Sequence, residues 1–163
     1  MLIGLLLGLS VAIALGYVGF LAWEGRGFPD TMTTVVYSLP KGWRRWMWTL
    51  WMWAMTLLMA PAIFKVVPES WHAAAHCFVT CQLVVALLPL MKEKDNTPHH
   101  VLAALDCVFS QICVVLICPA LMLGWFPLLM SFQRTGNDKA VSVAESECWL
   151  MLVMAVTIKL SML

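Results

Sequence analysis

Long apolar runs, separated by short polar stretches, are the main pattern of this chain. A helix needs about 20 mostly apolar residues to cross the roughly 30 Å of hydrocarbon in a bilayer. Five runs approach or exceed that length, and they predict an all-α fold, a polytopic transmembrane helix bundle of about five spans in a single domain, residues 1–163. The predicted spans are residues 2–23, 46–66, 71–91, 100–126 and 145–163.

The first and last runs differ from the other three. No Lys or Arg precedes Glu24, so the first run is expected to remain as a membrane anchor, because a cleaved signal peptide begins with a basic region. The last run is short and carries Lys159. We therefore expect it to lie tilted or to end at the membrane interface.

Turn-forming residues separate the middle spans. Pro68 lies between the second and third runs, and Asp95-Asn96-Thr97-Pro98 lies between the third and fourth. Asn96 or Thr97 is placed to cap the fourth helix. Such short connections predict that the second, third and fourth spans are antiparallel neighbours.

Basic residues are divided unevenly between the predicted loops. The first and third loops hold six Lys and Arg residues, against three for the second and fourth. Loops on the cytoplasmic side of a membrane are enriched in Lys and Arg, and Lys159 falls on the richer side if five spans alternate. The pattern predicts an N-terminus outside and a C-terminus inside.

The composition agrees with a bilayer environment. Hydrophobic residues make up 62% of the chain and charged residues 12%, with a mean hydropathy of +0.86. A water-soluble domain has roughly 45–50% apolar and about 25% charged residues. The formal net charge of +1 leaves no basic excess to hold nucleic acid. We therefore expect an integral membrane protein in contact with lipids, with no nucleic-acid partner.

Polar side chains share one face of the fourth predicted span. His99, Asp106 and Ser110 are spaced by seven and four residues, which places them on one side of a helix. An ionisable group inside a span costs at least about 2.5 kcal/mol on insertion scales, so Asp106 calls for a reason. We expect a ligand-binding or structural polar site here, formed by His99, His100, Asp106, Ser110 and Gln111.

A second polar stripe begins the third span. His72 and His76 are four residues apart, and two histidines at that spacing on one helix face can ligate Zn²⁺. Together with Asp106 they define an alternative function, a metal-dependent intramembrane hydrolase whose metal-bound water is the nucleophile. The predicted topology places the two histidines far from Asp106. The favoured interpretation is therefore that they lie at the interface and that the protein holds no metal and no other cofactor.

Small residues recur along the first span. Gly4, Gly8, Ala12 and Gly16 stand at every fourth position, and such a helix-packing face lets another helix approach closely. Two interpretations are open. The face contacts a second copy of the chain or a membrane partner protein, or it packs against later helices of this chain.

Tryptophans crowd the beginning of the second span. The outer members of this group fit an interfacial aromatic belt, whereas Trp51 and Trp53 lie deep enough to pack against helices or lipid. The group consists of Trp43, Trp46, Trp48, Trp51 and Trp53.

No catalytic motif is found. The sequence has no GxSxG, HExxH or Gly-rich phosphate loop, and its six cysteines form no CxxC pair and are expected to be buried thiols. These observations favour a non-enzymatic membrane protein that acts by contacting lipid, a small ligand or a partner protein. A further alternative is a small channel or transporter subunit, but the two polar stripes reach only half the depth of the membrane.

Two stretches carry a resemblance to known proteins. They are Phe28-Pro29-Asp30-Thr31, continuing to Tyr37-Ser38-Leu39-Pro40, and Pro98-His99-His100-Val101-Leu102-Ala103-Ala104. Together they resemble an uncharacterised class of small bacterial multipass proteins and, more distantly, the DRAM/Frag-type membrane proteins. The resemblance implies a helical bundle in the bacterial inner membrane, without an assigned chemistry. That family has six helices, and this sequence departs from it by having five predicted spans.

Overall fold

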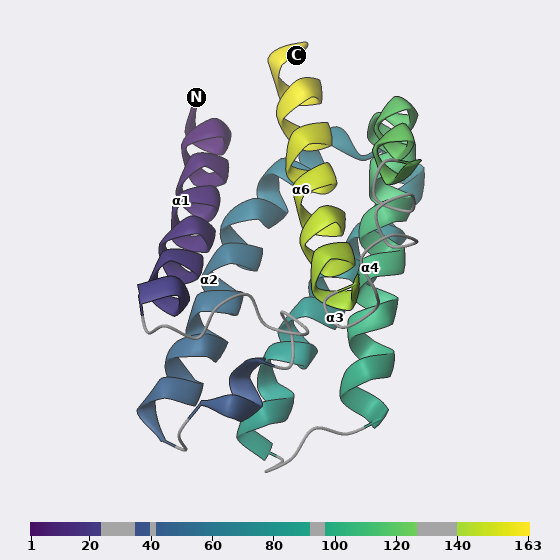
Figure 1. Ribbon diagram of the computed structural model, residues 1–163. Coiled ribbons are helices and arrows are strands. Elements are labelled where there is room, and N and C mark those ends of the chain that lie inside the picture. The colour runs from purple at the N-terminus through teal and green to yellow at the C-terminus, as the bar shows by residue number, and fades with distance from the viewer. Residues whose placement is uncertain (24–34, 40–41, 92–96, 127–139) are drawn as a thin grey trace.

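The computed structural model describes residues 1–23, 35–39, 42–91, 97–126 and 140–163. These residues form helices and no strand, which confirms the predicted all-α fold (Figure 1). The long helices are α1 (Leu2–Trp23), α2 (Trp43–Val66), α3 (His72–Met91), α4 (Thr97–Ile117) and α6 (Ala140–Ser161). Three short 3-10 helices are η1 (Val35–Ser38), η2 (Glu69–Trp71) and η3 (Pro119–Gly124).

A tight hairpin joins α2 to α3. Val67 is extended, with φ −71° and ψ 134°, because the residue before a proline avoids the helical conformation. Its N–H still bonds to the carbonyl of Ile63 at 2.9 Å, which closes the last turn of α2. Pro68 then leads into η2, and α3 begins at His72, directly after η2.

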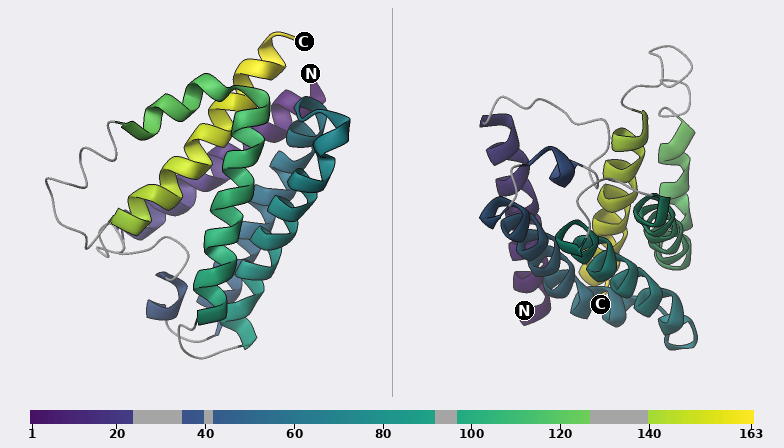
Figure 2. Two further views of the ribbon diagram at one scale, coloured as in Figure 1. Left: turned by 90° about the vertical axis from the view of Figure 1, so that its right-hand side faces the viewer. Right: turned by 90° about the horizontal axis from the view of Figure 1, so that it is seen from below.

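The predicted fourth span, residues 100–126, is wrong at its C-terminal end. α4 begins at Thr97 and ends at Ile117. Cys118 leaves the helix, with φ −153° and ψ 80°, because Pro119 disfavours the helical conformation at the residue before it. The chain then turns away from the α4 axis into η3, which lies beside α6 (Figure 2).

Helices that are consecutive in the sequence pack side by side. α1 packs on α2, α2 on α3 and α3 on α4, while α6 packs mainly on α4. The polar atoms between helices are used in side-chain hydrogen bonds to carbonyls. Thr49 Oγ1 on α2 donates to the carbonyl of Ala86 on α3 at 2.8 Å, and Ser10 Oγ on α1 donates to the carbonyl of Met55 on α2 at 2.7 Å. As predicted, α2, α3 and α4 are antiparallel neighbours (Figure 1).

The two termini lie at the same end of the bundle (Figures 1 and 2). The sequence predicts opposite sides, because five spans are an odd number. The difference arises after α4, where the break at Cys118 and Pro119 reverses the chain direction, so that α6 runs parallel to α4 (Figure 1). Lys159 therefore lies toward the end of the bundle that holds the N-terminus, not toward the end where α2 begins.

Four of the helices, covering Leu2–Phe20, Trp43–Val66, Glu69–Met91 and Pro98–Ile117, are long and apolar enough to cross a membrane. The fifth predicted span, residues 145–163, is helical as part of α6, but it carries Glu145, Glu147 and Lys159 and is not among these four.

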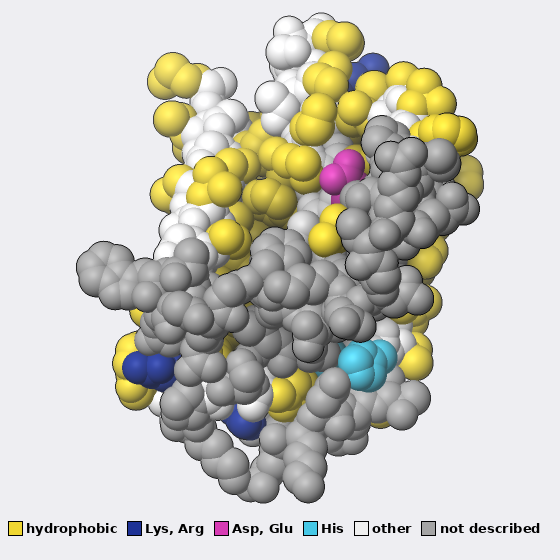
Figure 3. Space-filling model, in the orientation of Figure 1, with side chains coloured by type: hydrophobic (Ala, Val, Ile, Leu, Met, Phe, Trp, Pro, Cys, Tyr) yellow, Lys and Arg dark blue, Asp and Glu magenta, His cyan; other side chains and the backbone are white. Residues whose placement is uncertain are grey.

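The outward face of the bundle is apolar. On α1, Leu2, Leu5 and Leu9 are exposed, and on α4 Val101 and Val108 are exposed. In Figure 3 hydrophobic side chains cover α1 and α6, while Lys and Arg side chains on this face lie toward the two ends. Such a surface matches lipid better than water, since soluble monomers rarely expose large apolar patches.

Candidate functional site

A buried carboxyl and a buried amide meet in the middle of the bundle. Asp106 is the tenth residue of α4, and it accepts a hydrogen bond at Oδ2 from Nε2 of Gln82 on α3 at 2.5 Å. Each side chain is only 7% exposed. The two remaining oxygen atoms, Asp106 Oδ1 and Gln82 Oε1, are buried and accept no hydrogen bond. Leaving buried polar atoms unpaired costs about 1–3 kcal/mol each.

These two residues line a cavity of about 320 Å³, which we call the interior cavity. It opens toward the surface at Leu15, Val18 and Leu150, which are 63%, 40% and 46% exposed. All five long helices contribute to its wall. Most of the wall is apolar, and two tryptophans face it. The lining residues are Ala14, Leu15, Val18, Trp51, Met52, Met55, Phe78, Gln82, Asp106, Cys107, Ser110, Glu145, Ser146, Cys148, Trp149 and Leu150.

The interior cavity lies where two apolar clusters of the core meet. One cluster joins α1, α2 and α3 and includes Ala14, Met52 and Met55. The other joins all five long helices and includes Phe78. Side chains from both clusters line the cavity, so well-packed core bounds it on two sides.

The structure divides the polar site predicted on α4. Asp106 and Ser110 line the interior cavity. His99 is fully buried nearer the beginning of α4, with its Nδ1 3.3 Å from the hydroxyl oxygen of Tyr37. His100 is exposed at the same end. Gln111 points toward α6, where its Nε2 donates to the carbonyl of Cys148 at 3.3 Å.

His99 belongs to a second polar cluster, at the end of the bundle where α2 begins. Arg45 on α2 is buried, and its Nη1 donates to the carbonyl of Pro89 at 3.3 Å. Its guanidinium carbon lies 5.8 Å from the centre of the Tyr37 ring. Arg45 Nε is buried without a hydrogen-bond partner. Neither Arg45 nor Tyr37 was predicted as a site residue. A basic residue near a predicted helix start, such as Arg45, is usually solvated.

The residues proposed for a metal site do not come together. His72 Nε2 lies 3.2 Å from the carbonyl oxygen of Val67, and the rings of both His72 and His76 pack against Phe64. In the described ranges no three His, Cys, Asp or Glu side chains are grouped so that they could hold a metal ion. The set His72, His76 and Asp106 is therefore not assembled.

The small-residue face of α1 points away from the rest of the chain. Gly4, Gly8, Ala12 and Gly16 are all exposed. A Cβ atom added at any of the three glycines would meet nothing within 4 Å. The side of α1 that packs on the bundle carries other residues, among them Leu7, Ser10 and Ala14.

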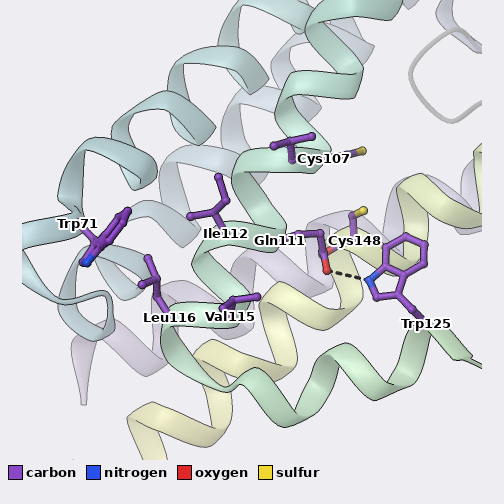
Figure 4. Close-up of a pocket in the computed structure, with 9 residues that line it drawn as sticks. Trp71, Cys107, Gln111, Ile112, Val115, Leu116, Trp125 and Cys148 are labelled. Atoms are coloured by element: carbon purple, nitrogen blue, oxygen red, sulfur yellow. Dashed lines mark hydrogen bonds between the residues drawn. The ribbon is translucent and has the colours of Figure 1, made fainter.

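A wider groove of about 650 Å³ runs along the outer side of α4, beside η3 and α6. Trp125 Nε1 donates to Gln111 Oε1 at 3.0 Å across it (Figure 4). Cys107 and Cys148 line both this groove and the interior cavity. They form the wall that separates the two spaces.

Gln82 and Glu145, two polar residues of the interior cavity, were not predicted as site residues. Gln82 is a single amide among apolar residues of the third predicted span, and its position there was the available signal. Glu145 lies at the beginning of the fifth predicted span, where an acid favours the helix N-terminus. Because α6 begins at Ala140, Glu145 instead lies more than one turn inside the helix.

The arrangement defines a helical bundle with a partly polar internal cavity. Comparisons with protein-family models, curated proteins and solved structures find no match to this chain. Its functional interpretation therefore rests on its own residues.

Proposed function

We propose that this protein is a multipass integral membrane protein that binds a small, mainly apolar ligand in the interior cavity without reacting with it. The observation that carries the proposal is the cavity itself, whose apolar wall includes a few convergent polar groups. Ligand-binding sites usually combine these two properties. The unpaired oxygens of Asp106 and Gln82 are available to accept hydrogen bonds from a ligand.

The proposal includes the membrane orientation. Six of the ten Lys and Arg residues belong to the segments that join α1 to α2 and α3 to α4 or to the first turn of α2, whereas Lys65 and Lys159 belong to the opposite end. By the positive-inside rule, both termini would be outside. We place the protein in the bacterial inner membrane, as the sequence resemblance implies.

α6 would be embedded with the other helices. Leu150 and Met154 are exposed on its outer side, and an exposed apolar face suits a helix surrounded by lipid. Because α6 is parallel to α4 (Figure 1), the two helices would cross the membrane in the same direction.

The outer surface of the bundle would contact lipid and, on α1, another protein chain. Its apolar side chains would face lipid, and the exposed small residues of α1 would offer a close approach to a second copy or to a membrane partner protein. The hydrolase alternative finds no support in the positions of His72 and His76, whose rings pack on Phe64.

Filling the cavity tests the proposal. Ala14 lines the interior cavity, so Ala14→Leu should occupy part of its volume, whereas Ala12→Leu adds the same atoms on the exposed face of α1. Calorimetric titration of the protein in maltoside micelles with octylamine, octan-1-ol and octanoate gives the measurement. We expect at least one probe to bind the wild type and Ala12→Leu with one-to-one stoichiometry, and Ala14→Leu at least about tenfold more weakly, a loss of roughly 1.4 kcal/mol.

Two results would contradict this function. Heat signals equal to those of protein-free micelles for all three probes would show that the cavity takes no such ligand. Equal binding by Ala14→Leu and the wild type would show that the probes bind elsewhere.

A further inference from the structure

We infer that the interior cavity is selective for a primary ammonium group at the head of a short apolar chain. This inference rests on the proposed function, because it names the chemical class of the ligand for the same cavity. It follows from the hydrogen-bonding groups that the cavity leaves unpaired, from the charges that line it and from its size.

Two of the unpaired groups at the cavity are acceptors, and a third, the indole Nε1 of Trp149, is a donor. Gln82 uses its Nε2 donor on Asp106, and this leaves Gln82 Oε1 and Asp106 Oδ1 without donors. The Ser110 hydroxyl is already in use, because it donates to the carbonyl of Cys107 at 2.8 Å, accepts from Gln111 Nε2 at 3.4 Å and interacts with the Cys148 thiol. The two oxygens of Asp106 and Gln82 therefore lack a donor.

A primary ammonium group matches this set better than other donors. It carries three N–H donors and no acceptor, so it can serve both oxygens at once. A hydroxyl group has one donor and can serve only one of them. An alkali metal ion would also accept oxygen ligands, but it would leave the apolar part of the cavity unfilled.

The charges around the cavity favour a cation. Among the described residues, its lining includes the two acids Asp106 and Glu145 and no Lys, Arg or His, and Glu145 already interacts with another group. Burying an ionised carboxyl is costly unless a cation accompanies it, and the described partner of Asp106 is a neutral amide. Trp51 and Trp149 also line the cavity, and tryptophan rings attract cations. A carboxylate or phosphate head would instead be repelled by Asp106.

The volume of the cavity sets the scale of the apolar chain that it can bury. At about 30 Å³ for a water-sized group, the 320 Å³ cavity has room for roughly ten such groups. An eight-carbon amine, with nine non-hydrogen atoms, fits this space. The walls formed by Met55, Phe78 and Leu150 suit its alkyl part.

The head-group series of the titration tests the inference. Octylamine should bind the wild-type protein at least about tenfold more tightly than octan-1-ol, the scale of one charged hydrogen bond, and octanoate should bind most weakly. Asp106→Asn should remove most of the preference for octylamine and change octan-1-ol binding by less than about threefold. Glu147→Gln is the matched control, because Glu147 is an acid of α6 that does not line the cavity; it should keep the preference.

A fourth probe tests the donors without any variant. Octyltrimethylammonium keeps the positive charge but has no N–H group, so it should bind the wild type at least about tenfold more weakly than octylamine. This comparison decides the inference even if Asp106→Asn does not fold.

The possible failures can be told apart. Equal wild-type affinities for octylamine and octan-1-ol, or for octylamine and its trimethyl analogue, would overturn the ammonium inference but leave the proposed function standing. An unchanged octylamine preference in a folded Asp106→Asn variant would do the same. No binding of any probe would overturn both and would point to a cavity filled by water only.

Discussion

At the scale of single residues, the clearest feature is the buried pair Gln82 and Asp106. The amide on α3 turns a donor toward the carboxyl on α4, and this contact joins the two helices in the middle of the bundle. The sequence alone indicates Asp106, because an acid inside an apolar run is costly. Its partner could not be predicted, since neither the depth nor the rotation of α3 relative to α4 follows from hydropathy.

Two variants separate the roles of this pair in stability. Asn at position 106 can still accept the Gln82 hydrogen bond and carries no charge, so Asp106→Asn should unfold at the same temperature as the wild type or higher. Gln82→Leu leaves the carboxyl without that donor and should lower the free energy of unfolding by roughly 1–3 kcal/mol. Thermal unfolding in detergent measures both. The opposite order of stability would mean that the contact contributes nothing.

At the scale of helices, apolar runs were enough to find α1, α2 and α3, but not the end of α4. Residues after Ile117 are as apolar as those before it, so hydropathy continues through the turn. The local signal was Pro119, whose effect on Cys118 breaks the helix.

The burial of the tryptophans in α2 could not be predicted from hydropathy either. Trp43 and Trp46 are exposed, but Trp48 is fully buried, and Trp51 Nε1 donates to the carbonyl of Ile13 at 2.9 Å.

Substitutions on the two faces of α1 should have different effects on stability. Leu7 is 6% exposed and packs in the core, so Leu7→Ala should lower stability by on the order of 2 kcal/mol. Gly8→Leu meets open space and should leave the stability of the single chain within about 0.5 kcal/mol, the range of surface changes. Unfolding in detergent at low protein concentration compares them. A larger loss for Gly8→Leu would show that the small-residue face is packed within the chain or against a second copy.

At the scale of the whole molecule, the sequence indicates the class of fold and the local order of α2, α3 and α4. The side on which the chain ends was not accessible, because it depends on the reversal between α4 and α6. The cavity was not accessible either. Its walls come from five helices. The spacing of residues within one helix does not predict how the other helices pack around it.

We propose that the helices cross a bilayer and bring both termini to one side, and impermeant maleimide labelling of intact cells tests this topology. Single cysteines would replace Glu69, Met91 and Met162, three exposed residues, with the wild-type chain and its native thiols as control. We expect labelling at 69 and 162 in intact cells, and at 91 only after permeabilisation. Labelling at 91 alone would reverse the proposed orientation, whereas labelling of 69 and 162 from opposite sides of the membrane would contradict the claim.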